Sequence, residues 1–71
     1  MKIYLVKYEF YIGIELKYYI IVKDSNIKVY SLNSEHLFTL DNDYIDFFNI
    51  EKEFNSFEEA EELVKTIGIF L

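Results

Sequence analysis

Three aspartates near the middle of the chain are the first side chains whose spacing could do chemistry. Asp41 and Asp43 occupy alternate positions, as the first ligands of a calcium-binding loop do, and Asp46 follows three residues later. The pattern then fails, because Ile45 fills the fifth position of such a loop and Lys52 the twelfth, where a bidentate glutamate is required. The spacing therefore favours a solvated turn over a metal site.

The other candidates for catalysis are equally weak. His36 lies two residues after Ser34, but the sequence lacks the G-x-S-x-G turn that exposes a nucleophilic serine. Glu9 and Glu15 lie among apolar and aromatic residues that could favour a protonated carboxyl, although pairing with lysines at the rim of a sheet explains them as well. Cysteine is absent, which excludes thiolate metal sites and cysteine nucleophiles. We predict a protein that is not an enzyme and binds no metal or cofactor.

Acidic side chains are concentrated in the second half of the chain. Residues 1–35 contain five lysines and four acids, whereas residues 36–71 contain two lysines and nine acids, and arginine is absent throughout. This distribution argues against direct binding of nucleic acid, since phosphates are held by clustered cations. It fits a protein partner with a basic surface, on which the acids would imitate a phosphate backbone. The residues expected to bind this partner are Asp41, Asp43, Tyr44, Asp46, Glu51, Glu53, Glu58, Glu61 and Glu62.

Four aromatic residues lie among these acids. Tyr44, Phe47, Phe48 and Phe54 are candidates for anchoring a partner, because aromatic side chains dominate the energetics of many interfaces, and they are equally candidates for the core. The acids also have a simpler alternative, which is a solvated face that maintains solubility. The sequence leaves both alternatives open.

The elements that must position these groups are mainly strands. Apolar and polar residues alternate with a period of two, and β-branched and aromatic types are frequent, as is typical of a pleated sheet. Gly13 predicts a turn between the first two strands, and the polar segment 24–26 predicts a short hairpin loop after the second. The strands are expected over residues 2–12, 15–23, 27–32, 37–40 and 49–54.

A C-terminal helix is predicted over about residues 57–67. Ser56 followed by Glu59 forms a capping box, and the apolar residues that come after it repeat at helical spacing. Residues 41–48 are expected to form an irregular loop or a single turn, with Asp41 in the N-cap position.

Together these elements predict a single α+β domain over residues 1–71, an antiparallel β-meander of three to five strands with one C-terminal amphipathic helix packed on one face.

The first two strands are apolar on both faces, but one helix can cover only one face of the sheet. A sheet face in contact with water is normally polar. We therefore expect a second molecule to cover the other face in a homo-oligomer such as a dimer. The expected oligomer interface comprises Ile3, Leu5, Tyr11, Tyr19 and Ile21.

Composition bounds the cellular context and the function. The chain is 52% apolar, lacks cysteine and has no apolar stretch of membrane-spanning length, which predicts a cytoplasmic protein without membrane contact. Residue types with A/T-rich codons predominate, which points to a low-GC bacterium, a phage or a mobile element. The leading hypothesis is a small acidic inhibitor that docks stoichiometrically on the nucleic-acid-binding surface of a partner such as a defence complex. The alternative is a homo-oligomeric structural or assembly protein that associates through its aromatic-rich sheet.

Overall fold

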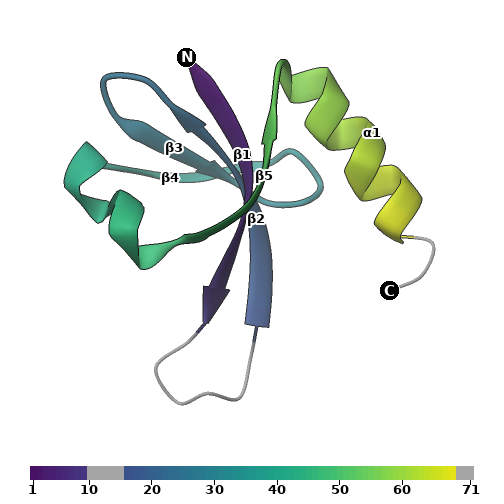
Figure 1. Ribbon diagram of the computed structural model, residues 1–71, viewed down its shortest axis with the longest axis horizontal. Helices are drawn as coiled ribbons and strands as arrows, with labels where there is room; N and C mark the ends of the chain where they lie inside the picture. The colour runs from purple at the N-terminus through teal and green to yellow at the C-terminus, as the bar shows by residue number, and fades with distance from the viewer. Residues whose placement is uncertain (10–15, 69–71) are drawn as a thin grey trace.

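The structure is a computed structural model that describes residues 1–9 and 16–68 (Figure 1). Within these residues, five strands form one open antiparallel sheet in the order β4-β3-β2-β1-β5, and one α-helix follows the last strand, which confirms the predicted α+β fold. The turn predicted at Gly13 lies outside the described residues. The elements are β1 (Lys2–Glu9), β2 (Leu16–Lys23), β3 (Ile27–Tyr30), β4 (His36–Leu40), the 3₁₀-helix η1 (Asn42–Phe47), β5 (Asn49–Phe54) and α1 (Phe57–Gly68).

Cross-strand pairing determines which side chains share a face of the sheet. Leu5 of β1 pairs with Ile20 of β2, and the neighbouring pair, Tyr4 with Ile21, points to the opposite face. Both faces of β1 and β2 therefore carry apolar side chains. Each face consequently needs its own cover.

Helix α1 covers the first face. Its Ala60 is fully buried against the apolar side chains of β1, β2 and β5. The helix begins as predicted, since the Glu59 N–H donates to Ser56 Oγ at 3.2 Å. The reciprocal bond reaches one residue further back than a standard capping box, because the Asn55 N–H donates to Glu59 Oε2 at 3.0 Å. In residues 1–9 and 16–68, no helix has the length and hydrophobicity to span a membrane.

Helix η1 and the residue after it cover part of the second face, on the side of the sheet away from α1 (Figure 1). Phe48 is buried there with Val6 and Ile21, and Ile45 packs against the same cluster. This segment was expected to be a loop or a single turn. Asp41 takes the N-cap position, but its side chain makes no capping hydrogen bond. The chain itself therefore supplies part of the cover that was expected from a second molecule.

The predicted oligomer interface combined residues from both faces, and that grouping is wrong. Ile3 and Leu5 lie beneath α1, whereas Tyr19 and Ile21 lie on the face covered by η1. Three of these side chains are buried within the chain, and Tyr19 is partly buried. Tyr11 lies outside the described residues. The four described side chains therefore form no common exposed surface for a second copy.

Asn42 fastens the start of η1 to the turn between β2 and β3. Its Nδ2 donates to the backbone carbonyls of Asp24 at 3.1 Å and of Ser25 at 3.0 Å. We expect Asn42→Asp to lower the free energy of unfolding by about 1–3 kcal/mol, because both donors are lost and a carboxylate faces two carbonyl oxygens. Urea denaturation measures this change. Asn33→Asp makes the same charge change at an exposed position and is the control; equal losses in both variants would contradict a role for the hydrogen bonds.

Candidate functional site

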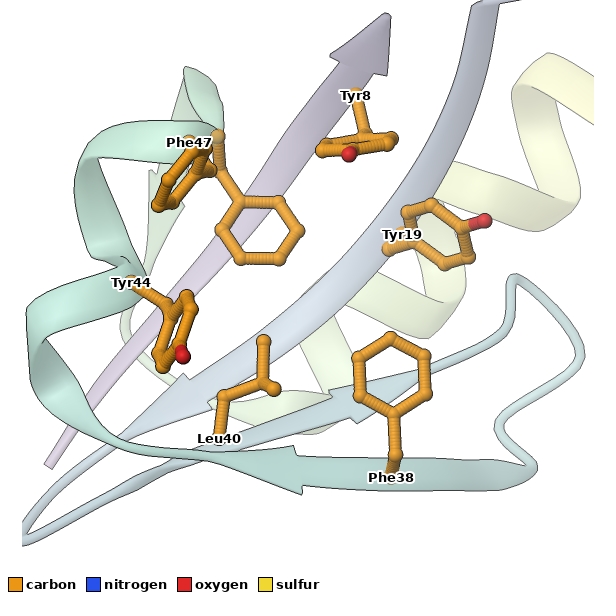
Figure 2. A pocket seen from close by; sticks show the side chains of 7 residues that line it. Tyr8, Tyr19, Phe38, Leu40, Tyr44 and Phe47 are labelled. Atoms are coloured by element: carbon orange, nitrogen blue, oxygen red, sulfur yellow. The ribbon is translucent and has the colours of Figure 1, made fainter. Parts of the chain in front are cut away.

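A groove of about 290 Å³ opens on the face of the sheet that η1 covers. Figure 2 shows side chains from strands and from η1 that surround one opening. Its volume lies near the lower limit of small-ligand pockets, and its lining is aromatic and aliphatic. The lining residues are Tyr8 from β1, Tyr19 from β2, Phe38 and Leu40 from β4, Tyr44 and Phe47 from η1, and Phe48.

The register of the sheet places the floor and one wall of this groove. Phe38 pairs with Val29, and Val29 pairs with Ile21. The Phe38 side chain therefore points to the same face of the sheet as the second core, the cluster of Val6, Ile21, Ile27, Val29 and Phe48. Tyr19 pairs with Val6 and reaches that face in the same way. Residues far apart in the sequence are thus brought to one opening by strand pairing.

The 3₁₀ geometry of η1 supplies the opposite wall. Side chains three residues apart are eclipsed in such a helix, so Tyr44 and Phe47 lie on one side and Ile45 and Phe48 on another. The rings of the first pair have centroids 5.7 Å apart and are 45% and 63% exposed, whereas Phe48 is 8% exposed. One pair therefore faces solvent at the groove while the other holds η1 on the sheet.

The structure separates the four aromatic candidates for anchoring a partner. Phe48 and Phe54 are core residues on opposite faces of the sheet. Tyr44 and Phe47 line the groove and are exposed. Phe38 was not among the predicted site residues, although its alternation with Leu40 indicates that both side chains share a face.

The predicted acidic surface is divided between distant parts of the fold. Three of its carboxylates are carried by η1 or the residue before it, next to the groove, and are exposed. The others lie on the edge strand β5 or on α1, which covers the opposite face (Figure 1). The first group is Asp41, Asp43 and Asp46, and the second is Glu51, Glu53, Glu58, Glu61 and Glu62.

Two acids of the second group, Glu53 and Glu61, have partners within the chain. Glu53 lies 3.1 Å from Lys2 Nζ, and the hydrogen bond and charge of this carboxylate raise the pKa of Lys2. Glu61 Oε2 accepts a hydrogen bond of 2.7 Å from Ser34 Oγ, which links the turn before β4 to α1. These two carboxylates interact within the chain, whereas Asp41, Asp43 and Asp46 are exposed beside the groove.

The geometry gives no support to the weak catalytic candidates. The Ser34 hydroxyl donates a hydrogen bond to Glu61, while His36 Nε2 lies 3.1 Å from Thr39 Oγ1. The serine and the histidine therefore interact with other side chains and not with each other. Within the described residues, no three histidine or acidic side chains form a group that could hold a metal ion. The side chains of Glu9 and Glu15 lie outside the described part of the structure.

Comparison with family models, with curated proteins and with solved structures finds no match to this chain. The groove, its exposed aromatic rings and the neighbouring carboxylates are therefore the features from which a function can be argued.

Proposed function

We propose that this chain is a non-enzymatic protein-binding module whose aromatic groove receives apolar and cationic side chains of a basic partner. The observation that carries the proposal is the exposure of Phe38, Tyr44 and Phe47 around one opening. Large apolar side chains that gather on the surface of a small protein commonly mark an interaction site. A partner that covers these rings would remove apolar area from water at a gain of about 25 cal/mol per Å².

Charge specifies the chemistry of this partner. The whole chain carries a net charge of −6, and Asp43 and Asp46 alternate with the groove-lining residues along η1. A lysine or arginine side chain over an exposed ring gains about 0.5–1 kcal/mol from the aromatic quadrupole and would also be attracted by these carboxylates. The site therefore suits a cationic protein surface better than a neutral or acidic one.

Proteins that bind nucleic acid present such cationic surfaces. A module that occupies one of them would compete with the phosphate backbone and would act stoichiometrically. We therefore propose inhibition of a nucleic-acid-binding protein as the biological form of the interaction. The location of the site on η1 and β4 reduces the role that the acids of α1 were expected to play.

Affinity capture from a bacterial host lysate, followed by mass spectrometry, tests the proposed function. We expect the wild-type chain to retain a basic protein, and Phe47→Ala to weaken its binding about thirtyfold, since a central aromatic contact contributes about 2 kcal/mol. The folded state should hardly change, because the Phe47 side chain is 63% exposed. Thermal denaturation of the variant measures this second expectation.

A pair of charge variants locates the acids that matter. Asp43→Asn with Asp46→Asn removes two charges beside the groove, and Glu58→Gln with Glu62→Gln removes two exposed charges from α1. We expect the double variant of η1 to capture less of the partner and to show a weaker dependence of capture on salt. The double variant of α1 should change the amount captured and its salt dependence less. Equal effects would mean that net charge alone governs binding, and retention of the same proteins by Phe47→Ala would contradict a site at the groove.

A further inference from the structure

The two edges of the sheet are protected to different degrees. An edge strand presents unpaired N–H and C=O groups, and proteins commonly shield it with charges or bulges. Edge strand β5 has both, because Glu51, Lys52 and Glu53 lie in its centre and its pairing with β1 is interrupted by a register shift. The pairing of edge strand β4 with β3 also has a register shift, but β4 carries neither acid nor lysine, and its Leu37 and Phe38 are each 44% exposed. Edge strand β4 is thus the edge that lacks acidic and lysine side chains against the approach of another strand.

Charge decides which strand fits this edge. In a two-fold antiparallel pairing of two copies about Phe38, Glu35 of one copy would lie beside Asp41 of the other at both ends of the strand. Like charges directly opposite each other are destabilising, and each copy carries a net charge of −6. The apolar strand with an acid at each end is instead complementary to a segment that carries lysine or arginine.

We propose that β4 receives an extended cationic segment of the partner as an additional antiparallel strand, an inference that rests on the proposed function. Backbone hydrogen bonds to β4 would hold the segment, as in other cases of strand addition. Alternate side chains of the added strand would lie beside Phe38 and Leu40 at the rim of the groove. The groove then selects apolar side chains on that face, while Glu35 and Asp41 attract the cationic ones.

A synthetic peptide of alternating lysine and valine, blocked at both ends, is the probe. It is titrated into the isotopically labelled full chain, and amide chemical shifts and hydrogen exchange are followed by NMR. We expect slower exchange at the outward-facing amides of β4 and no change at β5, which serves as the internal control edge. N-methylation of the peptide along both edges should weaken binding at least tenfold, and replacement of its lysines by glutamate should abolish binding.

The outcomes separate this inference from the proposed function. Equal binding of the parent and N-methylated peptides, with shifts at Tyr44 and Phe47, would overturn strand addition and leave a groove that binds cationic side chains. Absence of binding by both peptides would overturn strand addition, while capture by the groove variants still decides the proposed function. Slow exchange at β4 without peptide, together with a dimer in sedimentation, would mean that a second copy occupies this edge.

Discussion

Replacing Phe48 with alanine is expected to lower the free energy of unfolding by about 3–5 kcal/mol, the usual cost of removing a buried phenylalanine side chain. The Phe48 ring is buried on the face of the sheet away from α1, and its centroid lies 5.8 Å from that of Tyr8. It is also the residue that follows η1, so its packing holds this helix on the sheet. Guanidinium denaturation of the wild type and the variant measures the change.

The neighbouring residue provides a matched control for this prediction. Phe47→Ala removes the same atoms one position earlier, but Phe47 is exposed, so we expect a change of at most about 0.5 kcal/mol. If Phe48→Ala leaves too little folded protein, Phe48→Leu and Phe47→Leu form a milder pair in which the same order should hold. Similar losses in the two members of a pair would show that η1 does not cover the second face.

The strands and the C-terminal helix could be predicted because their signals are local. Alternation within β1 and the capping box at Ser56 and Glu59 depend on residues a few positions apart. The assignment of faces failed because it depends on the register between strands. Leu5 was grouped with Ile21, although Leu5 pairs with Ile20 and the adjacent residue of a strand points the other way. Alternation along a strand shows which of its own residues share a face, but it does not show how that strand is aligned with its neighbour.

The groove was harder to predict than the sheet. Spacing of three relates Tyr44 to Phe47 and Ile45 to Phe48, but over so few residues it also fits an α-helix or a loop. Phe47 and Phe48 are adjacent residues of the same type, and only tertiary packing makes one exposed and the other buried. The wall formed by Phe38 depends further on pairing between β3 and β4. A site built from several elements is therefore visible only when they are assembled.

The arrangement of two cores on opposite faces of one sheet makes a prediction about adjacent residues of β2. Ile20 is fully buried beneath α1, and Ile21 is fully buried on the face covered by η1. We expect alanine at either position to cost about 2–5 kcal/mol in the free energy of unfolding. A sheet with one face in water would show a large loss at one position and a small loss at the next, because successive side chains point to opposite faces.

The control and the milder variants make this test decisive. A domain of this size is stabilised by about 0.05–0.15 kcal/mol per residue, so either alanine variant could unfold the chain. Ile20→Val and Ile21→Val should each cost about 0.5–1.5 kcal/mol and keep it folded. Ile50→Val removes the same methyl group from an exposed position in β5 and should cost less than either. A loss at Ile21 no larger than that at Ile50 would mean that the second core does not stabilise the chain, and that its face needs a cover from another molecule.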